Sequence, residues 1–320
     1  DARDRILTYG DVTFTHAPTG EITTKTDASS GDVTTYVHDA VGNLRAVGLP
    51  DGTTIEYLVD GEGRRVGKKV DGVLERGWLW SGKLRPVAEL NAAGVVTKRF
   101  VYADGVNVPE LMVTATATHR LVKDHLGSVR RVVDVATGAV LQAIECDAWG
   151  RVLSDTNPGA QPFGFAGGLY DADTGLVRFG RRDYSAEVGR WWSKDPIRFA
   201  GRDLNFYAYV GNGPVVRTDA AGLILNTQNQ GDPSLLDDIL DAISGALGES
   251  IRDSFTPHYD GEDFDDDIAG MFVPQIRYPE CHIVPFTQID ACCRRATGYH
   301  DADYGEDMCP GASGDTLLKY

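Results

Sequence analysis

Short segments in which apolar and polar residues alternate recur along the first half of the chain. Three clear examples are VTTYVHD, TIEYLVD and VLERGWLWS. Alternation of this kind is typical of β-strands that bury only one face. Each segment ends in Asp or Ser with a Gly nearby, and these residues favour tight turns. The pattern therefore predicts a series of β-hairpins.

The hairpins repeat with a period of about 21 residues, as expected for one structural unit per repeat. Tyr36-Val-His-Asp-Ala-Val-Gly42 returns as Tyr57-Leu-Val-Asp-Gly-Glu-Gly63. We expect the Tyr of each unit to pack against the sheet and the Asp to cap the turn. Successive units must stack to cover their apolar face. Fainter copies begin at Phe14, Trp78, Phe100 and Ile144.

The period breaks at about residue 160, where Gly and aromatic residues become dense. We predict a compact plug over residues 161–223, with a strand-like segment at Leu204–Val210. The sequence thus divides into a repeat sheet (1–160), the plug (161–223) and a separate, partly α-helical domain (224–320). In the last domain, SLLDDILDAISGALGESIRDSF has the apolar spacing of an amphipathic helix. The expected fold class is mainly β.

Charge separates the last domain from the rest of the 320-residue chain. The formal net charge is −16, and residues 224–320 contribute 19 acidic and 5 basic side chains. Such acidity disfavours a nucleic-acid surface, which needs concentrated positive charge. No apolar run reaches the roughly 18 residues that a membrane-spanning helix needs. Because the chain opens on DARDRIL, without Met or a signal peptide, we expect it to be a fragment of a longer protein.

Four motifs in and before the plug resemble the C-terminal signature of the Rhs/YD-repeat proteins, which are bacterial toxin carriers related to the C subunits of insecticidal toxin complexes. They are DHLGSVR (124–130), PFGFAGGLYDADTGLVRFGRRDY (162–184), GRWWSKDPI (189–197) and NFYAYVGNGPVVRTDAAGL (205–223). The resemblance implies hairpins that wind into a hollow β-shell, completed by upstream repeats of the same protein. Residues after Leu223 lie outside the resemblance.

The resemblance also implies an aspartyl-type peptidase in the plug, formed by Asp195 and Asp219, that cuts the chain's own Leu223–Ile224 bond. Two carboxylates held close together titrate at different pH values, so that one can act as the base toward water and the other as the acid. No cofactor is needed for this chemistry. The cut would free residues 224–320.

Both aspartate motifs depart from the DPxG pattern of the family. Arg198 stands where the first motif normally has Gly, and Ala220 stands where the second normally has Pro. Losing a Pro, which fixes φ, is expected to loosen the turn and slow cleavage. Lys194 or Arg217 is a candidate to neutralise the pair of acids.

The last domain contains motifs of its own. DACCRR and HDADY resemble parts of the DxCCxxHDxCY helix of secreted calcium-dependent phospholipases, which would make His300 the base and Asp301 the calcium ligand, with phospholipid as substrate. Here six residues rather than two separate CC from HD. A zinc site, a metal-dependent nuclease built around HIVPF, and disulfides are the alternatives. The candidate zinc ligands are Cys281, His282, Cys292, Cys293, His300 and Cys309.

The sequence therefore predicts the C-terminal part of a polymorphic toxin that is secreted, or delivered into a target cell by a bacterial secretion system. By resemblance, a cognate immunity protein is expected as a partner. The alternative is a non-enzymatic adhesin, like the related eukaryotic YD-shell receptors that bind partner cells. An adhesin needs neither the aspartate pair nor the change in composition after Leu223.

Overall fold

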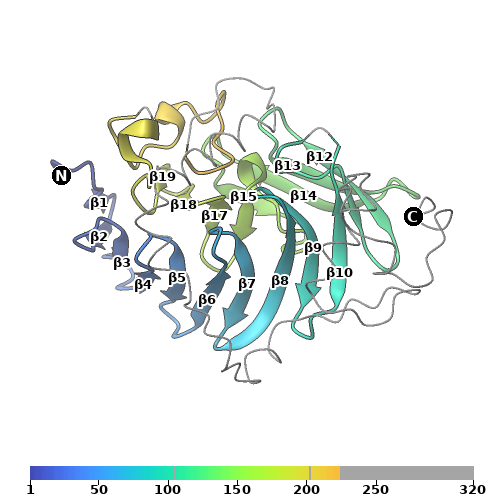
Figure 1. The fold of residues 1–320 in the computed structure, drawn as a ribbon, viewed down its shortest axis with the longest axis horizontal. Helices are drawn as coiled ribbons and strands as arrows, with labels where there is room; N and C mark the ends of the chain where they lie inside the picture. The colour runs from blue at the N-terminus through green and yellow to red at the C-terminus, as the bar shows by residue number, and fades with distance from the viewer. Residues whose placement is uncertain (104, 202, 224–320) are drawn as a thin grey trace, which may run out of the picture. The chain divides into compact units, whose positions relative to one another are not determined.

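The structure is a computed structural model that describes residues 1–103, 105–201 and 203–223 (Figure 1). The helix and the metal, base and disulfide residues predicted in 224–320 lie outside these residues. Within the described ranges, no helix is long and apolar enough to cross a membrane.

Most of the described chain forms one antiparallel sheet of 15 strands, and each strand pairs with the next strand in the sequence. The mainly β fold class is therefore confirmed. Its strands are β1 (Thr8–Tyr9), β2 (Val12–His16), β3 (Ile22–Asp27), β4 (Val33–His38), β5 (Leu44–Gly48), β6 (Thr54–Val59), β7 (Arg65–Val70), β8 (Val73–Ser81), β9 (Arg85–Asn91), β10 (Val96–Val101), β11 (Leu111–Val113), β12 (Thr118–Lys123), β13 (Val129–Asp134), β14 (Val140–Cys146) and β15 (Val152–Asp155).

The turn at the end of each repeat is formed by the predicted Asp and Gly residues. Asp60 Oδ1 accepts hydrogen bonds from the backbone N–H groups of Glu62 at 3.0 Å and Arg64 at 2.9 Å. Gly63 has a φ of +77°, a conformation that Gly adopts without the steric penalty of a Cβ atom. Tyr57, in the strand before the turn, is 1% exposed. The predicted roles of the Tyr and the Asp are therefore confirmed. The same pair of side-chain hydrogen bonds is made by Asp39, Asn91, Asp124 and Asp147.

The plug contains a second antiparallel sheet of four strands, with short 3₁₀ helices. Its segment Leu204–Val210 was expected to be strand-like, but it forms bends and turns that lead into a 3₁₀ helix at Val210, with one isolated bridge between Ala208 and Arg190. The plug elements are η1 (Phe165–Gly167), β16 (Leu169–Asp171), β17 (Leu176–Phe179), β18 (Arg182–Ser185), β19 (Arg190–Trp191), η2 (Arg198–Gly201) and η3 (Val210–Asn212).

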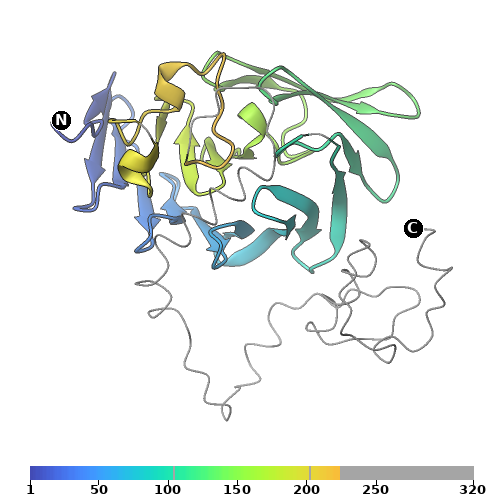
Figure 2. The ribbon, with the colours of Figure 1, turned by 45° about the horizontal axis from the view of Figure 1, so that its top comes forward.

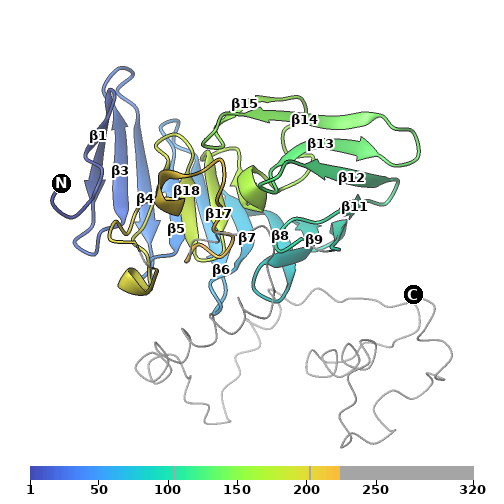
Figure 3. The ribbon, with the colours of Figure 1, turned by 90° about the horizontal axis from the view of Figure 1, so that it is seen from above.

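The large sheet curves so that both its early and late strands pack on the plug (Figures 2 and 3). At one side, the ring of Trp192 lies 6.0 Å from Phe14 and 5.4 Å from Tyr36. At the other, Phe163 lies 5.0 Å from Phe100. Aromatic contacts of this kind contribute beyond the apolar area that they bury. The plug thus forms a shared core with the repeats on both sides.

A buried ion cluster also joins the plug to the repeats. Asp183 of β18 binds Arg65 Nη2 of β7 at 2.7 Å and Arg178 Nη1 of β17 at 2.8 Å. Arg65 in turn lies over the Tyr57 ring, with its guanidinium carbon 3.5 Å from the ring centroid. All three charged side chains are 2–3% exposed. Charges this deeply buried need their partners, so the cluster fixes how β17 and β18 sit on β7.

Candidate active site

The two predicted acids meet at one nitrogen atom of a third residue. Asp195 Oδ2 lies 2.9 Å from Arg182 Nη2, and Asp219 Oδ2 lies 3.2 Å from the same atom. Asp195 is 7% exposed and Asp219 is 3% exposed. The carboxylates therefore converge in a site that is largely shielded from solvent, although 24 positions separate them in the sequence.

Asp219 is positioned by a turn that shares two hydrogen bonds with the repeat turns. Its Oδ1 accepts the backbone N–H of Leu223, four residues on, at 3.0 Å. Its carbonyl oxygen accepts the N–H of Gly222 at 3.3 Å, and Gly222 has a φ of +66°. Because Oδ1 holds the turn, Oδ2 is directed to Arg182. The DAAG sequence thus retains a DxxG turn despite Ala220.

Close backbone packing holds this turn on the plug sheet. A Cβ atom on Gly222 would lie 2.4 Å from the Phe179 carbonyl oxygen, and one on Gly180 would lie 2.3 Å from the Ala221 carbonyl oxygen. The backbone N–H of Arg181 also donates to that Ala221 oxygen, at 3.0 Å. Glycine is required where two backbones approach so closely. This contact places Asp219 beside β18, which carries Arg182.

Asp195 sits at the start of a similar turn. Its Oδ1 accepts the backbone N–H of Ile197 at 2.9 Å, and its carbonyl oxygen accepts that of Arg198 at 3.1 Å. Arg198, at the place of the family's Gly, has a φ of +52°. The left-handed conformation is thus kept by a residue for which it costs roughly 1–2 kcal/mol.

The carbonyl of Leu223, the residue before the predicted cut, faces the same site. A Cβ atom on Gly201 would lie 2.9 Å from Asp195 Oδ2 and 3.2 Å from the Leu223 carbonyl oxygen. Gly201 therefore lies between the acid and the carbonyl, and any side chain there would enter the gap. The other half of the predicted scissile bond, Ile224, lies outside the described residues.

The two acids differ in their hydrogen-bond partners, and the surroundings of Asp195 favour its protonated form. Burial is the main cause that raises the pKa of Asp195, to about 6; the nearby Asp219 raises it further, while Arg182 opposes the shift. Part of the Asp195 population therefore carries a proton near neutral pH. A protonated carboxylic acid beside a carbonyl oxygen can act as a general acid.

Arg182 is the site residue that the sequence analysis missed. Neither Lys194 nor Arg217 makes a described ion pair with the two acids, whereas Arg182 binds both. Its guanidinium lies 4.1 Å from the Trp191 ring centroid, and its Nε donates to the Gly222 carbonyl oxygen at 2.5 Å. Burial lowers the pKa of Arg182, whereas the neighbouring Asp195 and Asp219 favour its charged form. The signal was the FGRRDY motif, which gave no indication of which arginine faces inward.

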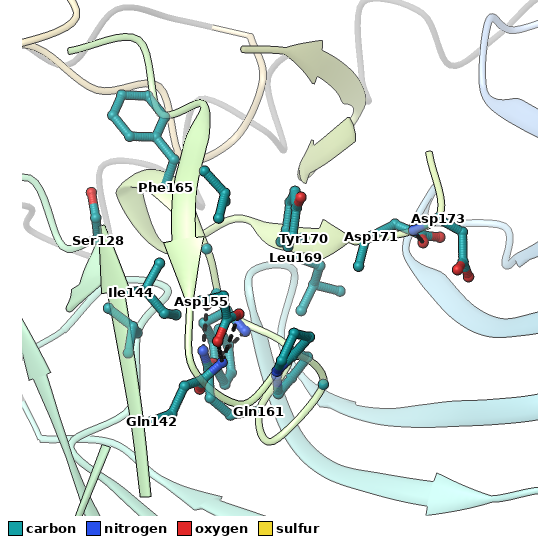
Figure 4. A pocket seen from close by; sticks show the side chains of 18 of the residues that line it. Ser128, Gln142, Ile144, Asp155, Gln161, Phe165, Leu169, Tyr170, Asp171 and Asp173 are labelled. Atoms are coloured by element: carbon teal, nitrogen blue, oxygen red, sulfur yellow. Dashed lines mark hydrogen bonds between the residues drawn. The ribbon is translucent and has the colours of Figure 1, made fainter. Parts of the chain in front are cut away.

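A cavity of about 190 Å³ is lined by residues of β7, β8, the late repeat strands and the plug, and neither predicted acid lines it (Figure 4). Two polar pairs lie in its lining: Gln142 Nε2 donates to Asp155 at 2.9 Å, and Lys68 Nζ donates to Asp171 at 2.7 Å. Within the part of the chain that the structure describes, no three His, Cys, Asp or Glu residues gather as metal ligands would.

Known proteins are similar to the described region. A family model described as Teneurin YD-shell matches residues 1–215. Teneurin-4 of Mus musculus is 30% identical over 227 residues, which cover 67% of this chain and 8% of that protein. Toxin protein Tse5 of Pseudomonas aeruginosa is 35% identical over 126 residues, which cover 38% of this chain and 9% of that protein. The chain thus spans less than a tenth of either relative.

Among solved structures, the crystal structure of TcdB2-TccC3-TEV is similar to this chain with a TM-score of 0.39 and 18% sequence identity. The similarity covers 67% of this chain and 10% of that one.

Proposed function

The chain belongs to the Rhs/YD-repeat shell family, and from this premise we propose that it is the C-terminal part of a toxin carrier that cuts itself between Leu223 and Ile224. Asp195 and Asp219 are the catalytic pair, and the cut frees residues 224–320. The observation that supports this function is the convergence of both carboxylates on Arg182, beside the Leu223 carbonyl.

The reaction is hydrolysis of one peptide bond. Asp219, as the carboxylate, takes a proton from a water molecule, whose oxygen attacks the Leu223 carbonyl carbon. Asp195, in its protonated form, gives its proton to the carbonyl oxygen. When the tetrahedral intermediate collapses, the C–N bond breaks, the Ile224 nitrogen takes the proton held by Asp219, and the hydroxyl returns its proton to Asp195.

Arg182 has two roles in this proposal. Its charge offsets the repulsion that two buried carboxylates would otherwise exert on each other. It also donates to the Gly222 carbonyl, one residue before the reacting carbonyl, and so keeps the backbone in place. Positioning of the reacting groups is a large part of enzymatic rate enhancement.

The remainder of the proposal concerns the longer protein. Upstream YD repeats extend the sheet into a shell that holds residues 224–320 until the protein is secreted or delivered into a target cell, and an immunity protein protects the producing cell. For the freed domain we propose a calcium-dependent phospholipase with His300 as base and Asp301 as ligand. Activity and metal assays would distinguish this function from two alternatives. One is a metal-dependent nuclease, and the other is a zinc site formed by Cys281, His282, Cys292, Cys293 and Cys309.

The test is the intact mass of the denatured full chain, compared among wild type, Asp195→Asn and Asp219→Asn. We expect wild type to break at Leu223–Ile224 and both variants to stay whole. Asp147→Asn is the matched control, because Asp147 Oδ1 also accepts the backbone N–H of the residue four positions on but makes no described ion pair with Arg182, and it should cleave like wild type. A folded, uncut wild type would contradict the proposal and favour a binding protein of the adhesin class.

A further inference from the structure

We propose that Leu84 and Ile197 form the pocket that receives the side chain before the scissile bond and so determines that the cut follows Leu223. This inference rests on the proposed function, because it concerns how that cleavage site is selected. It assigns a role in cleavage to the repeat sheet itself, since Leu84 lies in the turn between β8 and β9.

A small apolar cluster carries the proposal. Leu223 is 3% exposed and Ala221 is 4% exposed, and Leu84 and Ile197 pack against them. This cluster is separate from the three larger cores of the described chain. The Leu223 side chain is therefore held in its own apolar site at the end of the DAAGL segment.

The pocket is coupled to both acids through the backbone. The N–H of Ile197 binds Asp195 Oδ1 at 2.9 Å, so one turn supplies both a pocket wall and the acid. The N–H of Leu223 binds Asp219 Oδ1 at 3.0 Å, so the residue in the pocket is also tied to the base. A side chain that fills the pocket thus fixes its own carbonyl relative to both carboxylates.

The other wall comes from a distant part of the chain and is itself held in place. Arg64, in the repeat turn after β6, donates from Nη1 to the carbonyl oxygen of Gly82 at 3.0 Å. Gly82 belongs to the β8–β9 turn that carries Leu84. The plug alone supplies only the Ile197 wall, so the complete pocket needs the folded repeat sheet.

The chemistry of the pocket selects aliphatic side chains of about the size of Leu. A charged side chain would be buried there without a partner, which is strongly unfavourable. A smaller side chain would leave a void and let the carbonyl shift, and a misplacement of about 1 Å can lower a rate by about a hundredfold. We therefore expect fast cleavage after Leu or Met, slower cleavage after Ala, and the slowest cleavage after Asp.

The first experiment changes only the residue before the cut. The full chain is refolded from urea and its cleavage is followed by intact mass. We expect Leu223→Met to cleave within about threefold of wild type, Leu223→Ala to cleave at least about tenfold more slowly, and Leu223→Asp at least about a hundredfold more slowly. Equal rates across the series would overturn the proposal. Because the sheet is unchanged, this series tests the pocket even where Leu84 variants fail to fold.

The second experiment asks whether Leu84 is a wall of the pocket. Leu84→Ala should slow cleavage of the wild-type site by at least about tenfold, yet it should speed cleavage of Leu223→Phe, because the space it opens accepts the larger ring. Leu204→Ala makes the same change at a leucine that is 83% exposed and should leave the rate unchanged.

The two proposals fail differently. If cleavage stops in Asp195→Asn but its rate is the same in every Leu84 and Leu223 variant, the pocket proposal is overturned and the proposed catalytic pair stands. Cleavage that persists in Asp195→Asn would overturn both.

Discussion

The Oδ1 atom of Asp219 accepts a 3.0 Å hydrogen bond from the backbone N–H of Leu223, the residue before the proposed cut. Asp60 makes the equivalent bond to Arg64 within the repeats, at 2.9 Å. The site is therefore built with the turn that joins the hairpins. What distinguishes Asp219 is the environment of its second oxygen, which lies against the buried guanidinium of Arg182.

Replacing Arg182 with Met should destabilise the fold by about 3–5 kcal/mol, because it leaves two buried carboxylates without their shared cation. Cleavage should also be lost. Urea unfolding followed by tryptophan fluorescence measures the stability. Adding Asp195→Asn should recover part of the loss, since it removes one of the two repelling charges.

The control for this prediction is Arg120→Met. Arg120 pairs with Glu110, but its side chain is 57% exposed, so the loss should stay within about 1 kcal/mol. Equal losses at the two arginines would show that Arg182 is not an essential partner of the acids.

The rate of self-cleavage should fall as the pH rises above about 6. Burial raises the pKa of Asp195 to about 6, so its carboxyl is mostly protonated below that pH and mostly ionised above it. Because the proposed acid is the protonated form, the rate should drop about tenfold for each pH unit beyond the pKa. Refolding the chain into buffers from pH 5.5 to 8.5 and measuring cleavage by mass gives the profile. A rate that rises with pH through this range would assign Asp195 the opposite role.

Arg198→Gly should stabilise the protein by roughly 1 kcal/mol, because Arg198 holds a φ of +52° that only Gly adopts without strain. Arg198 is exposed, so little packing is lost. Thermal unfolding measures the change. Lys69→Gly is the comparison, since Lys69 lies within β7; there Gly should destabilise by roughly 0.5–1 kcal/mol. If both substitutions changed the stability in the same direction, the strain argument would be contradicted.

Asp183→Asn should destabilise the protein by about 3–5 kcal/mol, because Arg65 and Arg178 would lose their shared anionic partner inside the core. Chemical denaturation measures the loss. Glu187→Gln removes a partner of Lys25 from an ion pair whose side chains are 24% and 38% exposed, and should cost less than about 1 kcal/mol. Similar effects of the two variants would mean that the buried cluster is not what joins plug and repeats.

The repeat sheet was predictable because its signals are local. Alternation, period and turn chemistry all lie within about 21 residues, and the roles of Tyr57 and Asp60 follow from them. The prediction of a strand at Leu204–Val210 was wrong because it also relied on local signals alone. Its aromatic residues resemble a strand, but contacts with distant residues decide their place, such as the hydrogen bond from the Tyr207 hydroxyl to the Gly20 carbonyl oxygen.

Of the residues in the candidate site, only the two acids were predicted from the sequence. Asp195 and Asp219 stood out through a family resemblance, and the structure places them together, while their catalytic role stays a prediction. Arg182 and Leu84 could not be identified, because FGRRDY does not indicate which arginine faces inward and the leucine in SGKL is an ordinary residue until the fold places it beside Leu223. The ion cluster of Arg65, Arg178 and Asp183 was missed for the same reason.

The order of strands in the large sheet has a consequence for when the site can form. Each strand pairs with the strand made just before it, so the repeats can fold progressively as the chain leaves the ribosome. The plug instead contacts residues synthesised far earlier: Tyr207 reaches Gly20, 187 positions away. Such contacts have high contact order and form late. A cut by the proposed pair would therefore follow completion of the fold, and its product would report that biosynthesis has finished correctly.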